Sequence, residues 1–300
     1  MIRTVLNDIE KEKLGVTLCH EHFIVDLDRV RHDGISMIET PEEVEPEIRK
    51  MMALGVQAAV EVSTIDLGRD VRKLKQISLD TGLTIVASTG FYLTQYHPEW
   101  LASASAAAIA EVYVRELTEG IDDTGIKAGI IAEIASSPER FEGEKEDSQG
   151  CGHRVRGRGR STHTGRATAV ETIETLLAEG MDPDKIIIGH QDLIDDTKYH
   201  VQLLKYGVNI AFDTCGKKAY MPDETRARNA LAIMEAGYGD HLLFSNDISR
   251  RTYFTSQGGD GYLSVMKWVI PLLKQIGASD RQIQRCLVDN PARILDNEWR

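Results

Sequence analysis

The chain has 300 residues, of which 42% are hydrophobic, and a formal net charge of −12 at pH 7. This length suits either two average domains or one large α/β barrel, and the negative charge disfavours a nucleic-acid partner, which needs a basic surface. No run approaches the roughly 18 apolar residues of a membrane span, the first residues lack the apolar core of a signal peptide, and the four scattered cysteines form no C-x-x-C pair. We therefore expect a soluble, cytoplasmic protein without a nucleic-acid or membrane partner.

Short apolar runs alternate with segments of helical pattern along the chain. Several runs are almost continuous valine, isoleucine and leucine, which is typical of parallel strands buried on both faces. The predicted strands are 16–19, 56–62, 83–89, 129–135, 160–164, 185–189, 208–212 and 241–245, of which 160–164 has the weakest pattern. The predicted helices are 41–53, 68–81, 99–118, 168–180, 195–205, 223–237 and 262–276.

This alternation predicts parallel β/α units, and eight units in this length favour a (β/α)8 TIM barrel that forms one domain over residues 1–300. The alternative is a doubly wound sheet, but no G-x-G-x-x-G follows the first strand. Residues 148–160, SQGCGHRVRGRGR, interrupt the pattern with four arginines and four glycines. Because glycine costs about 1 kcal/mol per helical position relative to alanine, this segment is either a surface loop or a poorly formed part of the barrel. It could also bind RNA, although the acidic chain disfavours this.

Potential metal ligands occur where the predicted strands end, which is where barrel enzymes place their catalytic groups. His20 and His22 end the first strand, and residues i and i+2 of a strand share a face. Glu133 lies within the apolar fourth strand, where a buried carboxylate needs a partner. His163 on the fifth strand, His190 after the sixth and Asp247 after the eighth complete a set of donors that suits two divalent ions.

Each of these residues also has a structural interpretation. A single histidine at a strand end is more often structural than a ligand, and Asp247 could cap the helix that follows it. These interpretations weaken together, because all six residues fall at the same end of their predicted strands. The other histidines do not fall at strand ends and are predicted to lie on the surface or in loops: His32, His97, His153, His200 and His241.

The motifs GVTLCHEHF, GIIAEIASS, STHT, IIIGHQD and LLFSNDISRR, with NPARIL near the end, resemble the successive strand-end motifs of the phosphotriesterase family in the amidohydrolase superfamily. The resemblance implies a distorted (β/α)8 barrel with a binuclear metal centre, usually two Zn²⁺ ions. It implies that Glu133 bridges the two ions. It further implies that the more buried ion is bound by His20, His22 and Asp247, and the more exposed ion by His163 and His190.

Two features depart from the best-known members of that family. The bridging residue there is a carboxylated lysine, whereas Glu133 resembles the phosphotriesterase homology and phosphotriesterase-related branch. Family members also have an Ala/Arg-rich helix before the fifth strand, which residues 148–160 do not resemble. The position of His163 therefore depends on how this segment folds.

The function predicted from these residues and this resemblance is a binuclear zinc-dependent hydrolase in which a metal-bridging hydroxide cleaves a carboxyl ester, lactone or related acyl bond. Asp247 is expected to accept the proton. Tyr92, Arg250 and Arg251 are expected to contact a small-molecule substrate, the arginines by pairing with a carboxylate or phosphate. The alternatives are a phosphoester, phosphotriester or N-acyl amide hydrolase of the same family, and a catalytically weak barrel that binds a metal or small ligand. The resemblance also makes a homodimer possible.

Overall fold

A sheet of eight parallel strands forms the centre of the computed structural model, which describes residues 1–137, 144, 146, 148–149, 160–164 and 168–297. The strands are hydrogen-bonded in the order β12-β11-β10-β9-β8-β7-β6-β3. Their bounds are β3 (Thr17–Glu21), β6 (Ala58–Glu61), β7 (Thr84–Thr89), β8 (Ile130–Ser136), β9 (Arg160–Thr164), β10 (Ile186–Ile188), β11 (Asn209–Phe212) and β12 (Leu242–Phe244).

The two edges of this sheet meet, so that it closes into a barrel. The Asp247 N–H donates to the His20 carbonyl across 3.2 Å, and the His20 N–H donates to Ser245 Oγ across 3.0 Å. The segment after β12 is thereby bonded to β3. These contacts confirm the predicted TIM barrel and exclude the doubly wound sheet. Irregular pairing within β3 and within β8 distorts the barrel at these two strands.

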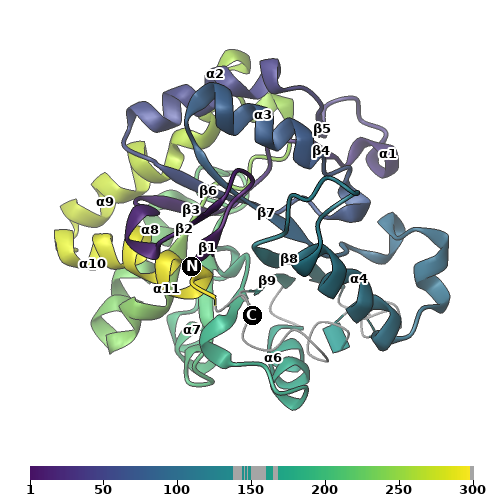
Figure 1. Cartoon of the computed structure of the whole chain (residues 1–300). Coiled ribbons are helices and arrows are strands. Elements are labelled where there is room, and N and C mark those ends of the chain that lie inside the picture. The colour runs from purple at the N-terminus through teal and green to yellow at the C-terminus, as the bar shows by residue number, and fades with distance from the viewer. Residues whose placement is uncertain (138–143, 145, 147, 150–159, 165–167, 298–300) are drawn as a thin grey trace.

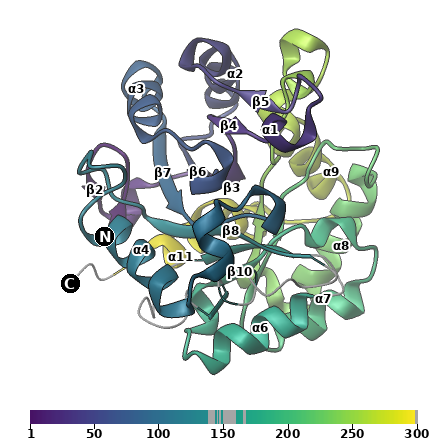
Figure 2. The same cartoon turned by 90° about the vertical axis from the view of Figure 1, so that its right-hand side faces the viewer.

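Helices surround the barrel (Figures 1 and 2), and none that the structure describes is long and apolar enough to cross a membrane. The major ones are α2 (Pro41–Ala53), α3 (Val71–Thr81), α4 (Ala106–Thr118), α6 (Ala169–Ala178), α7 (Thr197–Leu204), α8 (Asp223–Ile233), α9 (Ile270–Gln275), α10 (Asp280–Gln284) and α11 (Asn290–Leu295).

Helix capping explains where the predicted boundaries hold and where they move. Helix α2 has the predicted bounds, because Thr40 and Glu43 form a reciprocal capping box at its start. Helices α3 and α4 begin three and seven residues later than predicted, at Val71 and Ala106. The side chains of Asp70 and Ser105 accept hydrogen bonds from the first-turn N–H groups of these helices and so fix their starts.

The N-terminal end of the barrel is closed by elements that the sequence did not predict. Strands β1 (Ile2–Arg3) and β2 (Asp8–Ile9) form a hairpin that lies near α11 and both chain termini (Figure 1). Ile2, Leu14 and Leu295 pack against the small side chains that fill the barrel interior, such as Val60 and Ala132. A packed interior leaves the opposite end, where the strands terminate, as the place for a site.

Candidate metal centre and substrate cavity

Three predicted site residues have the same unusual backbone conformation. Glu133, His190 and Asp247 have φ angles of +54°, +57° and +54°. For a residue with a Cβ, this left-handed region costs roughly 1–2 kcal/mol. Strain of this kind concentrates at functional sites, where the surrounding structure holds it in place.

The left-handed backbone at Glu133 changes the direction in which its side chain points. Ala132 packs in the barrel interior and Ile134 packs on the outside against the helices. Glu133 lies between them and lines a cavity at the C-terminal end of the strands. The pairing of β8 with β9 shifts register between Ile131 and Ile134, so a local irregularity in the strand delivers the carboxylate to the site.

Four predicted ligands converge at the floor of this cavity. His20 Nε2 lies 2.8 Å from Glu133 Oε1 and 3.9 Å from Asp247 Oδ1. His22 Nε2 lies 3.2 Å from the same Asp247 oxygen. In a tetrahedral site with ligand distances of about 2.0–2.1 Å, the donor atoms lie about 3.3 Å from one another. The observed spacing therefore fits donors that share one divalent ion.

His20 provides a second test of whether these residues fit a metal. Its ring is 1% exposed and faces a carboxylate on each side, because Nδ1 lies 3.3 Å from Asp213 Oδ2 and Nε2 faces Glu133. Burial by itself lowers the pKa of His20, but the attraction of Asp213 and Glu133 raises it to about 10. A neutral imidazole has a single N–H and can donate to only one of the two carboxylates. A cation between His20 and Glu133 would take the place of the second proton.

His190 lies on the other side of His20, with the two ring centroids 5.2 Å apart. His190 Nδ1 lies 2.7 Å from Asp213 Oδ1. Burial lowers the pKa of His190, but the nearby Asp213 carboxylate outweighs this effect and raises the pKa above its usual value. Among the described residues, the groups that could hold an ion are His20–His22–Glu133 and His20–His190–Asp213. His163 lies on β9 as predicted, in register with Ala135 of β8, but its side chain is outside the described residues.

Asp213 was not among the residues predicted from the sequence, although the sequence holds a signal for it. Asp213 directly follows β11, just as predicted site residues follow or end other strands. It is fully buried. Its pKa would be raised by burial but is lowered by His190 and His20. A carboxylate after an apolar strand at the same end of the barrel could have been added to the predicted set on that position alone.

The ring of His22 is oriented by a chain of buried polar groups. His22 Nδ1 lies 2.9 Å from Ser63 Oγ, and Ser63 Oγ–H donates to Glu61 Oε1 across 2.5 Å. Burial raises the pKa of Glu61 to about 8, although hydrogen bonds from Ser63 and from the backbone oppose this. This series of hydrogen bonds from Glu61 through Ser63 holds His22 Nε2 toward Asp247. Outer hydrogen bonds of this kind fix the orientation of metal-binding imidazoles in proteins.

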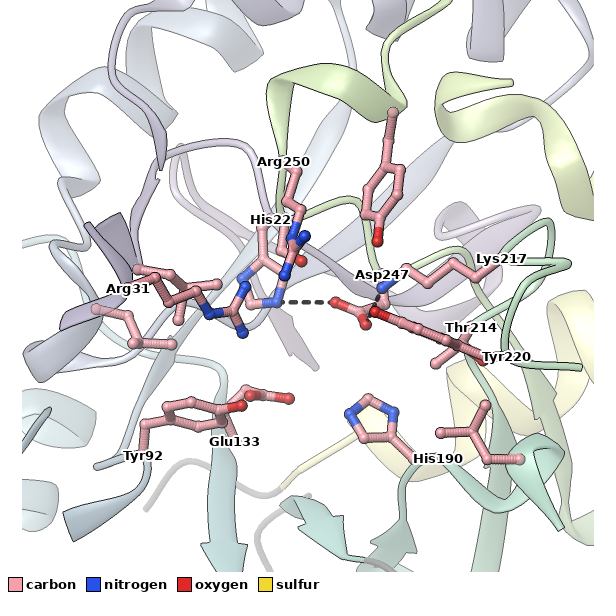
Figure 3. Close-up of a pocket in the computed structure, with 15 residues that line it drawn as sticks. His22, Arg31, Tyr92, Glu133, His190, Thr214, Lys217, Tyr220, Asp247 and Arg250 are labelled. Atoms are coloured by element: carbon pink, nitrogen blue, oxygen red, sulfur yellow. Dashed lines mark hydrogen bonds and ion pairs between the residues drawn. The ribbon is translucent and has the colours of Figure 1, made fainter. Parts of the chain in front are cut away.

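Asp247 does not serve as a helix cap. Its Oδ1 faces His22 and its Oδ2 forms an ion pair with Lys217 Nζ, as the dashed lines in Figure 3 show. Burial would raise the pKa of Asp247, but Lys217 and the hydrogen bond from His22 hold it well below its usual range. Lys217 was not predicted as a site residue, because it lies in the loop after β11, where no periodic pattern indicates which side chains face the site.

The cavity above these groups has a volume of about 160 Å³. The structure places Tyr92 and Arg250, which were predicted to contact a substrate, in its wall. It adds Arg31 from the short helix α1 (Asp28–Arg31), and Figure 3 shows both arginines pointing toward the centre of the cavity. Arg251 does not line the cavity. It pairs instead with Glu39 and Glu43 at 3.0 and 2.9 Å. The remaining polar lining residues include Thr214, Lys217, Tyr220, Ser249 and Tyr253.

His153 lies outside the described residues, and among the histidines that the structure describes one lies elsewhere than predicted. His200 is not on the surface or in a loop but on α7, fully buried, with Nε2 2.9 Å from the Gln191 carbonyl oxygen. Its ring packs against Phe212 of β11. It is therefore a core histidine that ties α7 to the segment after His190.

A parallel barrel that gathers imidazoles and carboxylates beyond the ends of its strands has the architecture of a metal-dependent hydrolase. Comparison with known families agrees with this class. The sequence model described as "Phosphotriesterase family" matches residues 1–295, and the chain belongs to that family.

Several relatives are similar over nearly the whole chain. The phosphotriesterase homology protein of Escherichia coli (strain K12) is 32% identical over 285 residues, which cover 94% of this chain and 98% of that protein. Its crystal structure, complexed with phosphate in the active site, has a TM-score of 0.91 and 32% identity, covering 95% of this chain and 99% of that one. Human N-acetyltaurine hydrolase is 26% identical over 339 aligned positions, which cover 98% of this chain and 97% of that protein. The structure of a lactonase from Listeria monocytogenes has a TM-score of 0.92 at 27% identity, covering 99% of each chain.

The family and these relatives bear out the predicted class of enzyme. The chain is a metal-dependent hydrolase that acts on ester or amide bonds of small molecules.

Proposed function

We propose that this chain is a binuclear zinc-dependent hydrolase that cleaves a carboxyl ester, lactone or related acyl bond in a small anionic substrate. The observation that carries the proposal is the position of His20, buried between Glu133 and Asp213 with donor spacings that suit a shared cation. His20, His22 and Asp247 would hold one ion, His190 and His163 the other, and Glu133 would bridge both. Two such ions supply an activated water at neutral pH and a Lewis acid for the scissile oxygen.

The groups around the proposed metal site would orient and deprotonate the reactants. Asp247 would accept the proton of the attacking water. Its ion pair with Lys217 keeps this carboxylate ionised and directs Oδ1 toward His22. Tyr92 lines the opposite side of the cavity and, with the leucine side chains of the wall, would exclude bulk water from the reacting bond.

The charge of the cavity wall favours an anionic substrate. Three cationic side chains line the cavity, those of Arg31, Lys217 and Arg250. Lys217 forms the ion pair with Asp247, and the two arginines take no part in that pair. A carboxylate, phosphate or sulfonate on the substrate could accept hydrogen bonds from the guanidinium groups. A neutral phosphotriester offers no such anion, so acyl cleavage suits this wall better. The phosphate in the active site of the E. coli relative supports an anion-binding role.

An N-acyl amide is the second candidate substrate, because several curated relatives are named N-acetyltaurine hydrolase. A third candidate function is a catalytically weak barrel that binds a metal or small ligand, which would retain fewer than two ions. We also propose, from the sequence and the family resemblance, a single domain over residues 1–300, a cytoplasmic location, no nucleic-acid or membrane partner, and a possible homodimer.

Metal content tests the binuclear site directly. We expect about two zinc ions per chain in wild-type protein purified without chelator, and fewer in Glu133→Gln and His163→Ala. Elemental analysis measures the ions, and circular dichroism verifies that each variant is folded. One ion or fewer in the wild type, unchanged by His163→Ala, would remove the second site and leave the ligand-binding barrel as the better description.

Paired arginine variants test the anionic substrate. We expect Arg250→Ala to raise KM for anionic lactones, esters or N-acyl amides roughly 10- to 100-fold, the equivalent of about 1.5–3 kcal/mol for a hydrogen bond to a charged group. Arg251→Ala is the matched control, since Arg251 pairs with Glu39 and Glu43 outside the cavity. Equal effects of the two variants, or equal turnover of neutral and anionic substrates, would contradict the proposed role of the wall.

A further inference from the structure

One buried carboxylate lies against ligands that the proposed function assigns to two different ions. Asp213 Oδ1 accepts a hydrogen bond from the His190 backbone N–H at 2.9 Å and lies 2.7 Å from His190 Nδ1. Asp213 Oδ2 lies 3.3 Å from His20 Nδ1. Each oxygen of Asp213 therefore faces the Nδ1 atom of a different histidine.

The end of β11 holds this carboxylate in a fixed place. The Asp213 and Thr214 N–H groups donate to Asp192 Oδ1 at 3.3 and 3.4 Å. Asp192 in turn accepts a hydrogen bond of 2.6 Å from the fully buried Arg226. The backbone on both sides of the Asp213 side chain is thus anchored to a buried ion pair, which holds in place the Cα from which the carboxylate extends toward the two rings.

Donor and acceptor chemistry gives this position a specific consequence. An imidazole that binds a metal through Nε2 carries its proton on Nδ1, and that N–H needs an acceptor. A carboxylate has two acceptor oxygens and no donor, so it can receive the Nδ1–H groups of both rings. An amide of the same shape has one acceptor oxygen and one NH₂ group, so it can serve one ring only. Its NH₂ group would force the other ring to accept at Nδ1 and to carry its proton on Nε2.

We propose that Asp213 is a positioning residue that sets the tautomer of His20 and of His190 together, so that both metal subsites depend on this single carboxylate. The inference rests on the proposed binuclear site. It goes beyond the proposed ligand set, because it assigns Asp213 to neither ion and has it act through one ligand of each. Asp213 Oδ1 holds His190 at two points, the backbone N–H and the ring Nδ1, and the backbone of His190 is left-handed.

The test is Asp213→Asn, which keeps the shape of the side chain and replaces one acceptor by a donor. The matched control is Asp223→Asn, another buried carboxylate, which bonds to Gly216 N and Arg226 and contacts none of the proposed ligands. The readouts are zinc ions per chain and the zinc dissociation constant from chelator competition. We expect Asp213→Asn to lose about one of two ions and to bind the remaining zinc 10- to 100-fold more weakly, while Asp223→Asn keeps wild-type content and affinity.

A second variant separates a missing acceptor from a misfolded site. Asp213→Ala leaves a space beside both rings, and formate, a small carboxylate, should restore zinc binding, whereas formamide should not. Full zinc content and unchanged affinity in Asp213→Asn, or equal rescue by formate and formamide, would overturn the role of Asp213 while leaving the binuclear hydrolase intact. Absence of two ions in the wild type would overturn the proposed function and this inference together.

Discussion

The strained backbone at Glu133 gives a prediction with a definite sign. Glu133→Gly and Glu133→Ala both remove the carboxylate, and they differ only in the Cβ methyl group and in the freedom of the backbone. At φ +54° a Cβ costs roughly 1–2 kcal/mol, which glycine does not incur. Against this, glycine loses more conformational entropy on folding, by roughly 0.5–1 kcal/mol relative to alanine. Deleting the methyl group at this buried position costs about 0.8 kcal/mol more, so Glu133→Gly and Glu133→Ala should be about equally stable.

Ala135, two residues along the same strand, is the matched control. It is fully buried and is not among the residues with positive φ. Ala135→Gly should lose roughly 0.5–1 kcal/mol from backbone entropy and about 0.8 kcal/mol from the deleted methyl group. Ala135→Gly has no strain relief to offset these losses, so replacing alanine by glycine is expected to cost roughly 1–2 kcal/mol more at position 135 than at position 133.

The assay is equilibrium urea unfolding of the three variants and the wild type with excess chelator, so that metal binding does not enter the comparison. The free energies of unfolding in water are compared pairwise. If the change from Glu133→Ala to Glu133→Gly costs as much stability as Ala135→Gly, the left-handed backbone at position 133 is not strained, and the fold does not hold strain at the site.

Two further predictions concern buried polar groups. Ser63→Ala should weaken zinc binding 10- to 100-fold in chelator competition, because His22 Nδ1 loses its partner. Ser63→Thr keeps the hydroxyl and should bind zinc within a few-fold of wild type. Equal zinc affinities of the two variants would contradict this role of Ser63. Arg226→Met should lower the free energy of unfolding by about 3–5 kcal/mol, because two buried carboxylates lose their cation. Arg228→Met, two residues along the same helix, removes an exposed pair and should cost at most about 1 kcal/mol in the same urea titration; similar losses would show that burial does not set the cost.

The ligands that could be predicted from sequence are those on or next to strands. His20 and Glu133 lie on β3 and β8, His190 and Asp247 follow β10 and β12, and a parallel barrel brings the C-terminal ends of its strands to one rim. Their order along the chain was therefore enough to infer that they meet. The fold was predictable for a related reason, since strands buried on both faces must be apolar along their whole length.

Residues in the connecting segments could not be placed in the same way. Arg31 reaches the cavity from α1, a four-residue helix in the segment after β3. Arg250 and Arg251 are adjacent in sequence, yet one lines the cavity and the other pairs with Glu39 and Glu43. No periodic pattern distinguishes them, because loop backbones do not alternate side chains regularly between two faces.

The sequence by itself determined the barrel and the set of metal-binding residue types at its rim, because hydrophobic periodicity and strand ends are local properties of the chain. Only the tertiary structure decided what lies around that set. Asp213 facing two histidines and Lys217 paired with Asp247 are contacts between segments that lie apart in sequence. The left-handed backbone at Glu133, His190 and Asp247 is a local conformation that the surrounding structure holds in place. They arise when the barrel closes and its packing and hydrogen bonds hold conformations that a free chain would avoid.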